Sequence, residues 1–289
     1  MRLLITGASG QLGGYLLREL RGTPDTVTAW CHQRGGELFG FRPVSVDLSQ
    51  RDVTAAAFRA ARPNAVLHFA GYSAIADCHR HPQTARRINT EGTALLAELS
   101  AEAGARLVYT STDLVFDGVK GNYREDDAAA PLSIYGGSKL AGEAAVLAAP
   151  KGLVVRVSLM FGPSLIGRPY FFDQQLAKMH AGQQTGWFED EWRSPLGLWP
   201  AARALLTLAR TDVAGLLHVG GPQRLSRYEL GQRIAAAHGL DSSLVTPVSQ
   251  KSVQTPEPRP RDVSLDSTRW RSLFPQQSWP GIEESLSTS

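Results

Sequence analysis

The strongest constraint on the fold is a glycine-rich loop that follows an apolar segment at the start of the chain. Residues 2–6 (RLLIT) predict a buried strand and residues 11–20 a helix, with Gly7, Gly10 and Gly13 in the connection. In a strand–loop–helix unit the first glycine allows a tight turn, the second a close approach of pyrophosphate, and the third close helix packing. Free N–H groups at the helix N-terminus bind phosphate. We therefore expect a nucleotide-binding unit; the alternative is an ordinary glycine-rich turn.

Strands and helices alternate through the first 160 residues. Further strands are predicted at residues 26–30, 43–46, 65–70, 107–110 and 153–157, and further helices at residues 53–61, 84–103 and 134–147. This alternation indicates βαβ units with parallel strands, whose right-handed crossovers put helices on both faces of the sheet. The predicted fold class is α/β, a Rossmann-type doubly wound parallel sheet with a smaller C-terminal substrate-binding cap.

After Phe161 the alternation is less regular. The elements predicted here are a helix at residues 201–210, a strand at 216–219, a helix at 228–238 and an extended proline-rich segment at 246–262. We divide the chain into a dinucleotide-binding domain with the catalytic residues (1–163) and a region that is mostly the cap (164–289). Some elements of the second region are expected to return to the main domain.

Composition argues against several other classes of protein. In 289 residues, 30 Lys and Arg side chains stand against 27 Asp and Glu without basic blocks, so nothing favours nucleic-acid binding. No run of about 18 apolar residues is present, so no membrane span is expected. Two cysteines and no signal-peptide pattern favour a cytoplasmic location. No metal site is expected, because the close pair His79 and His81 is more typical of a solvated loop.

The end of the second predicted strand bears on the choice between NAD and NADP. An acidic residue there would bind the ribose 2′-hydroxyl of NAD, but residues 29–34 (AWCHQR) contain none. They contain His32 and Arg34, and a guanidinium suits a 2′-phosphate. We therefore expect NADPH to be preferred, with NADH as the alternative. Arg34 could also be a solvated loop residue in an arginine-rich chain.

Tyr135 and Lys139 form a Tyr-x-x-x-Lys pattern at the start of a predicted helix, which puts both on one face. A tyrosine pKa near 10 is too high for proton transfer at neutral pH, so we expect the lysine and an oxidised nicotinamide to lower it. Thr112, at the end of the strand before, would hold the substrate oxygen beside the tyrosine. The alternative is a chance spacing of surface residues, with Ser111 and Thr112 binding backbone groups.

Two segments around these residues carry a family resemblance. Residues 111–118 (STDLVFDG) and 123–143 (YREDDAAAPLSIYGGSKLAGE) resemble the dTDP-4-dehydrorhamnose reductase family, in the extended branch of the short-chain dehydrogenase/reductases. The Gly-x-x-Gly-x-x-Gly spacing of the first loop is similar to that superfamily. The resemblance implies that Thr112, Tyr135 and Lys139 are the catalytic residues.

Similar motifs extend along the chain, at residues 47–48, 68–78, 87–93, 155–162 and 259–266. The cofactor-binding residues expected from the loop and the resemblance are Gly7, Ser9, Gly10, Gln11, Leu12, Gly13, His32, Arg34, Asp47, Leu48, Phe69, Ala70, Gly71, Tyr72, Asn89, Tyr135 and Lys139. The expected substrate-binding residues are Ser73, Thr112, Asp113, Trp192 and Arg193. For Trp192 the alternative is packing within the cap.

Three departures from the family pattern leave the substrate open. Leu114 stands where an aromatic residue is usual, His68 where asparagine is frequent, and residues 182–200 match no family segment. We favour an NADPH-dependent reductase of a keto group on a nucleotide-linked sugar. The alternatives are an epimerase of the same fold and a non-catalytic NADP-binding regulatory subunit, as in the β subunit of methionine adenosyltransferase. Related dehydratases carry an acid where Leu114 stands, which disfavours dehydration. The oligomeric state is open, and a homodimer is one alternative.

Overall fold

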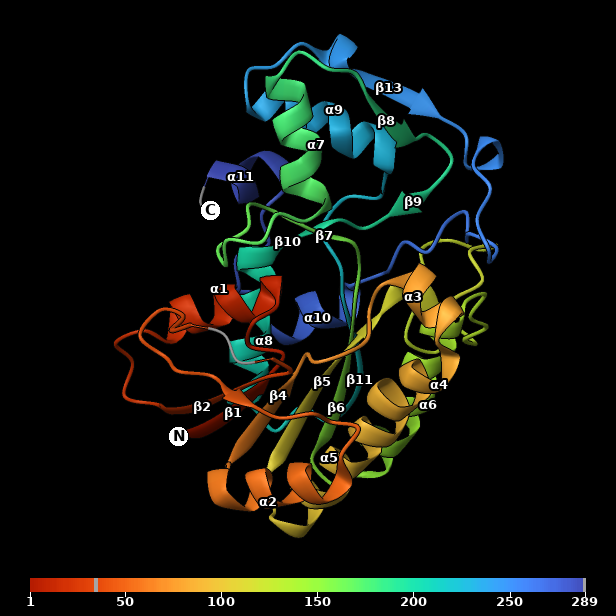
Figure 1. Ribbon diagram of the computed structural model, residues 1–289. Coiled ribbons are helices and arrows are strands. Elements are labelled where there is room, and N and C mark those ends of the chain that lie inside the picture. Colours follow the sequence, from red (N-terminus) through yellow and green to blue (C-terminus); the bar gives the residue numbers. More distant parts are fainter. Residues whose placement is uncertain (34–35, 288–289) are drawn as a thin grey trace.

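The computed structural model describes residues 1–33 and 36–287. Its centre is a seven-stranded sheet in the order β11-β6-β5-β4-β1-β2-β3, in which each neighbouring pair is parallel (Figure 1). The strands are β1 (Arg2–Thr6), β2 (Thr26–Cys31), β3 (Val44–Ser45), β4 (Ala65–His68), β5 (Arg106–Thr112), β6 (Gly152–Val157) and β11 (Gly215–Val219). The chain reverses its direction of progress between β1 and β4, where doubly wound folds bind their ligands. The predicted fold class is confirmed.

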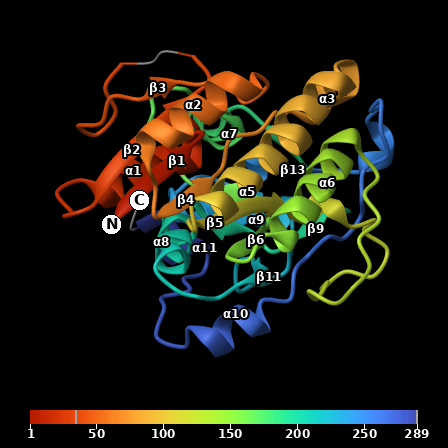
Figure 2. The same ribbon diagram turned by 90° about the horizontal axis from the view of Figure 1, so that it is seen from below.

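Helices cover both faces of the sheet (Figure 2). The helices are α1 (Gln11–Leu20) and α8 (Leu198–Ala209) on one face, and α2 (Arg51–Ala61), α5 (Thr93–Glu102) and α6 (Ile134–Ala148) on the other. The alternation of side chains along β1 explains the two layers, because Leu3 and Ile5 join the core with α1 and α8, while Leu4 joins the core with α5 and α6. Both α8 and β11 come from the second half of the chain, so this half contributes to the central sheet layers.

One long predicted helix, at residues 84–103, is divided in the structure. It consists of α4 (Pro82–Ala85), a π-helical stretch (Arg86–Gly92) and α5, and a short helix α3 (Ile75–Arg80) precedes it. A π-helical turn widens the backbone and changes the direction of the side chains within it. Here it contains Asn89, which is buried and directed at the loop after β4.

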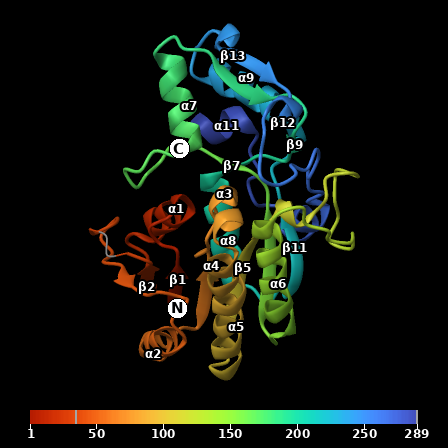
Figure 3. The same cartoon turned by 45° about the vertical axis from the view of Figure 1, so that its right-hand side comes forward.

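The cap lies above the carboxyl ends of the strands (Figure 3). Its helices are α7 (Phe171–His180), α9 (Arg227–Ala237) and α11 (Ile282–Ser287); its strand pairs are β7 (Met160–Phe161) with β10 (Leu196–Gly197), β9 (Trp192–Arg193) with β12 (Leu225–Ser226), and β8 (Thr185–Phe188) with β13 (Val245–Val248). Trp187 is buried in the cap core, where Gly231 leaves room for its ring. The predicted extended segment contains β13, a 3-10 turn (Gln250–Ser252) and an irregular stretch before α10 (Thr268–Leu273).

Candidate active site

Two connected cavities lie at the carboxyl edge of the sheet. A cleft of about 720 Å³ between the sheet and the cap is lined by the glycine loop, the ends of β5 and β6, the start of α6 and arginines of the cap. A second cavity of about 360 Å³ extends from it over β2 and the loop after β3. Gly7, His32, Ala70 and Gly71 line both cavities. A long ligand with two ends could therefore lie across the switch point of the sheet.

The glycine loop is packed so tightly that side chains are excluded at two positions. Gly7 has a φ of +70°, and a Cβ there would lie 2.7 Å from the backbone nitrogen of Ala70. A Cβ on Gly13 would lie 2.5 Å from the carbonyl oxygen of Gly7. Gly10 precedes α1 without a side-chain cap, so the first N–H groups of the helix have no side-chain partner there. Ser9, Gln11 and Leu12 also line the cleft, as the sequence predicts.

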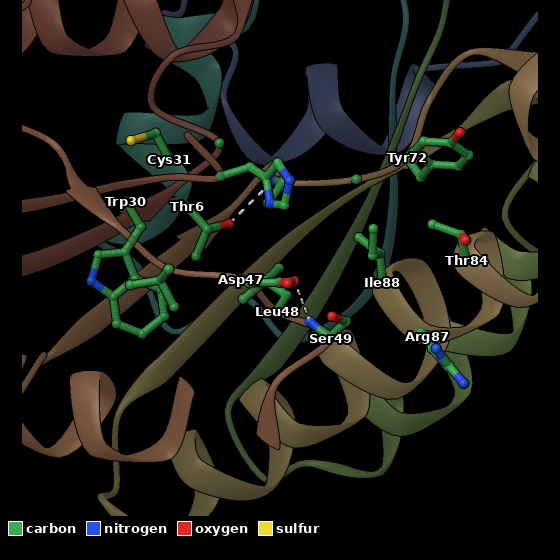
Figure 4. Close-up of a pocket in the computed structure, with 15 residues that line it drawn as sticks. Thr6, Trp30, Cys31, Asp47, Leu48, Ser49, Tyr72, Thr84, Arg87 and Ile88 are labelled. Carbon is green, nitrogen blue, oxygen red and sulfur yellow. Dashed lines mark hydrogen bonds between the residues drawn. The ribbon is translucent and has the colours of Figure 1, made fainter. Parts of the chain in front are cut away.

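The second cavity is lined by Trp30 on one side and Tyr72 on the other (Figure 4). Asp47 and Leu48 lie at its floor, and the Ser49 N–H donates to Asp47 Oδ1 at 2.9 Å. Arg87, from the π-helical stretch, lies at its edge. His32, a predicted cofactor residue, lines this cavity, whereas Arg34 lies outside the described residues.

Thr112, Tyr135 and Lys139 line the same cleft. Gly136 makes this possible, because a Cβ there would lie 2.2 Å from the Leu114 carbonyl oxygen; the start of α6 therefore packs directly on the loop after β5. The Thr112 hydroxyl accepts from the Leu114 N–H at 3.2 Å. Lys139 is buried, and its Nζ donates to the Thr110 carbonyl at 2.8 Å and lies 4.1 Å from the centre of the Tyr109 ring.

Burial shifts the pKa values of both Tyr135 and Lys139. Burial, followed by the Asp113 carboxylate, raises the pKa of Tyr135, and only the Thr112 hydroxyl opposes this substantially. Burial lowers the pKa of Lys139 to about 7, with Glu143 acting in the opposite direction. In the chain alone, burial therefore dominates the pKa of Tyr135. The expected lowering by the lysine and an oxidised nicotinamide concerns the cofactor complex and stays a prediction. Tyr135 is a protonated acid at neutral pH.

Asn89 connects two elements beneath the cleft, the loop after β4 and helix α6. Its Oδ1 accepts from the Tyr72 N–H at 2.7 Å, and its Nδ2 donates to the Tyr72 carbonyl and to Ser138 Oγ. Ser138 in turn donates to the Tyr135 carbonyl. The predicted cofactor residue Asn89 thus lies beneath the cleft and connects the loop after β4 to α6, while Phe69, Ala70 and Gly71 line the cleft itself.

His68 is held in one tautomer by two threonines. Thr93 Oγ1 donates to the Asn89 carbonyl, so it accepts from His68 Nε2 at 2.9 Å. His68 Nδ1 therefore accepts from Thr6 Oγ1, at 2.7 Å. Burial and the nearby Lys139 lower the pKa of His68 to about 3, so the ring is neutral. Asparagine is frequent at this position in the family, and the His68 ring that stands here also provides one hydrogen-bond donor and one acceptor.

The cap end of the cleft is rich in arginine. Arg193 lies 3.5 Å from Asp113 Oδ1, and Asp113 Oδ2 accepts from Ser158 at 2.8 Å. Arg227 and Arg259 share the fully buried carboxylate of Glu191. Burial lowers the pKa of Arg227 to about 10, which leaves it charged. This end of the cleft suits an anionic group, because three guanidinium groups face two carboxylates.

The predicted substrate residues are distributed unevenly. The residues that line the cleft are Ser73, Thr112, Asp113 and Arg193. Trp192 is not among its lining residues, and its ring packs against the guanidinium groups of Arg224 and Arg261. Arg168 and Arg227 also line the cleft, and the sequence analysis did not predict them as site residues. Arg259 lines it too and was predicted only as part of the motif at residues 259–266. For Arg227 a signal existed, since Ser226 and Glu229 form a capping box that marks the start of α9.

Comparison with known families identifies the family of the chain. The family model described as RmlD substrate binding domain matches residues 1–287. The chain belongs to the RmlD substrate binding domain family. Within this family and fold it is an NAD(P)-dependent oxidoreductase of the short-chain dehydrogenase/reductase type. The resemblance stated from the motifs is confirmed.

Three relatives of this RmlD-family chain illustrate its range. It is 34% identical to a dTDP-4-dehydrorhamnose reductase of Mycobacterium tuberculosis (strain CDC 1551 / Oshkosh), over 96% of the chain and 90% of the relative. It is 30% identical to methionine adenosyltransferase 2 subunit beta of Bos taurus, over 99% and 87%. The crystal structure of a Bacillus anthracis dTDP-4-dehydrorhamnose reductase in complex with NADP superposes with a TM-score of 0.88, at 26% identity over 99% and 97%.

Two further observations concern the described part of this RmlD-family chain. None of its helices has the length and apolar character needed to cross a membrane. Residues 1–33 and 36–287 contain no group of three or more His, Cys, Asp or Glu side chains that could hold a metal ion.

Proposed function

We propose that the chain is an NADPH-dependent reductase of a keto group on a nucleotide-linked sugar. The observation that carries the proposal is that Thr112, Tyr135 and Lys139 line one cleft with the glycine loop and with four arginines of residues 164–289. The chemistry therefore has a proton donor, a phosphate-binding loop and an anion-binding end within one cavity. The cytoplasmic location and the homodimer stay predictions.

The two cavities fit a dinucleotide. The N-terminus of α1, which Gly10 leaves without a side-chain cap, would bind the pyrophosphate. Asp47 and Leu48 would contact the adenine, and His32 would lie near a 2′-phosphate. Lys139 would hold the nicotinamide ribose by a hydrogen bond. The reduced nicotinamide, when bound, supplies the hydride.

The chain's own residues supply the proton and the orientation. Tyr135 keeps its proton at neutral pH, because burial raises its pKa, and gives it to the substrate oxygen as that oxygen gains negative charge. The Thr112 hydroxyl, beside it, holds the same oxygen. Arg227 and Arg259 would bind the diphosphate of the sugar nucleotide, since Glu191 balances only part of their charge.

The test is the oxidation of NADPH by a panel of nucleotide-linked keto-sugars, with NADH as the cofactor comparison. We expect turnover with at least one keto-sugar and its loss in Tyr135→Phe. NADPH binding without turnover on any keto-sugar would contradict the reductase.

That second result would favour a regulatory role. The specific observation behind this alternative is the 30% identity to methionine adenosyltransferase 2 subunit beta over nearly the whole chain. The alternative predicts that Tyr135→Phe leaves every measurable property of the NADPH complex unchanged.

A further inference from the structure

One segment of the chain connects the cap to the catalytic helix. We call residues 249–262 the strap. Its first end is held at the cap, where Ser249 Oγ donates to Asp190 Oδ2 at 2.7 Å. Its last end is held beside β9, where the Trp192 N–H donates to the Arg261 carbonyl at 2.8 Å. Residues 251–256, between these attachments, are exposed.

Glu257 is the first buried residue after that exposed stretch. Its Oε1 accepts from the backbone N–H of Ile134 at 2.9 Å and lies 3.4 Å from His79 Nδ1 of α3. Ile134 is the first residue of α6, directly before Tyr135. A carboxylate at a helix N-terminus is favourable, because it accepts an unpaired N–H and meets the positive end of the helix dipole.

The helix does not need this carboxylate for its local capping. Ser133 already caps α6, and its hydroxyl accepts from the Gly136 N–H at 3.1 Å. Glu257 adds a bond from a residue 123 positions away in the sequence. Two residues after Glu257 the same strap carries Arg259, which lines the cleft and pairs with the buried Glu191. The strap therefore contacts the proton donor's helix and the anion-binding end together.

We propose that Glu257 is a positioning residue, which fixes the first turn of α6, and with it Tyr135, relative to Arg259 on the same strap. The catalytic part of this role rests on the proposed function, because Tyr135 donates a proton only if the chain is a reductase. The structural part does not rest on the proposed function. Binding of a nucleoside diphosphate at the arginine end of the cleft should reduce motion of the strap and of the first turn of α6.

Three variants test the proposal in the full chain with NADPH bound. Glu257→Ala removes the acceptor, Glu257→Gln keeps an amide oxygen for the Ile134 N–H, and Glu98→Ala removes an exposed carboxylate elsewhere as the control. Circular dichroism establishes that each variant is folded. The readouts are kcat and KM for the keto-sugar, and amide hydrogen exchange of residues 133–139 with and without dTDP as the probe.

We expect Glu257→Ala to lower kcat by about tenfold with little change in KM, because the substitution changes the orientation of Tyr135 and removes no substrate contact. We expect exchange at Ile134 to be about tenfold faster, and dTDP to lose its protective effect on residues 133–139. Glu257→Gln should restore kcat and exchange to within about twofold of the wild type. Glu98→Ala should match the wild type.

Two results would overturn the proposal. The first is a kcat and an exchange rate in Glu257→Ala equal to those of the wild type. The second is a loss of kcat in Glu257→Gln as large as in Glu257→Ala, while exchange at Ile134 stays slow. The second result would mean that charge matters and position does not. If the wild type reduces no keto-sugar, the proposed function fails, and the exchange data with dTDP decide the strap's role alone. If Glu257→Ala does not fold, Glu257→Gln and the wild-type response to dTDP still decide it.

Discussion

The glycine-loop end and the cap end of the cleft are built in different ways. At the loop end the site is formed by backbone atoms. Glycine is required at Gly7 and Gly13, because a Cβ at either position would collide with neighbouring backbone. At the cap end, charged side chains from α9 and the strap meet at Glu191, a buried residue just before β9. The first arrangement depends on residues next to one another in the sequence, and the second on residues that only the fold brings together.

The largest expected effect is at the point where the two ends meet. Tyr135→Phe should lower kcat by about 10²- to 10⁴-fold, because it removes the only proton donor assigned to the substrate oxygen. The Kd for NADPH, measured by fluorescence titration, should stay within about twofold of the wild type. A variant that keeps more than a tenth of the activity would show that another group supplies the proton.

A substitution at the loop end should damage cofactor binding and stability together. Gly13→Ala puts a Cβ 2.5 Å from the Gly7 carbonyl oxygen, so helix α1 must move away from the loop. We expect a loss of about 1–3 kcal/mol in the free energy of unfolding and a weaker NADPH complex, measured by thermal unfolding with and without NADPH. The matched control is Gly137→Ala, because Gly137 has open space for a Cβ and no positive φ. Gly22→Ala would not serve, because Gly22 has a positive φ. Unchanged NADPH affinity in Gly13→Ala would contradict the assigned role of the loop.

A substitution at the cap end should damage substrate binding alone. Arg227→Ala leaves Glu191 paired with Arg259, so the buried carboxylate keeps a partner. We expect KM for the sugar nucleotide to rise by about tenfold or more, with the Kd for NADPH unchanged. Arg224→Ala serves as the control, because Arg224 pairs with Asp262 and does not line the cleft. Equal effects of the two substitutions would remove the case for a specific anion site.

The last expected effect is a pH dependence of the free energy of unfolding. The pKa of Lys139 in the folded protein is about 7, below its ordinary value of 10.5, so the unfolded chain binds more protons between these values. The free energy of unfolding should therefore rise with pH in this window, by about 1.4 kcal/mol per pH unit at most, relative to Lys139→Met. Urea unfolding of both proteins from pH 7 to pH 10 measures the difference. A constant difference across that range would mean that the lysine is not buried as a neutral amine.

The same contrast explains what could be predicted from the sequence. The strands, the glycine loop and the Tyr135–Lys139 pair follow from local patterns, and the structure has each of them. Arg227 and Glu191 could not be paired in advance, because no local pattern brings β9 and α9 together. The π-helical turn at Asn89 was also missed, since its hydrogen bonds to Tyr72 and Ser138 are long-range.

The position of β11 and α8 has a consequence for how the chain folds. Strand β11 pairs with β6 at one edge of the sheet, and α8 packs on α1, although both come after the first cap segment in the sequence. The nucleotide-binding layer therefore cannot be completed until the ribosome has released most of the chain. A fragment ending at residue 163 would expose the apolar surface of Leu3 and Ile5 that α8 covers and is expected to aggregate. Exchange of caps between relatives by recombination would accordingly require at least three crossover points, because α8 and β11 lie between cap elements in the sequence.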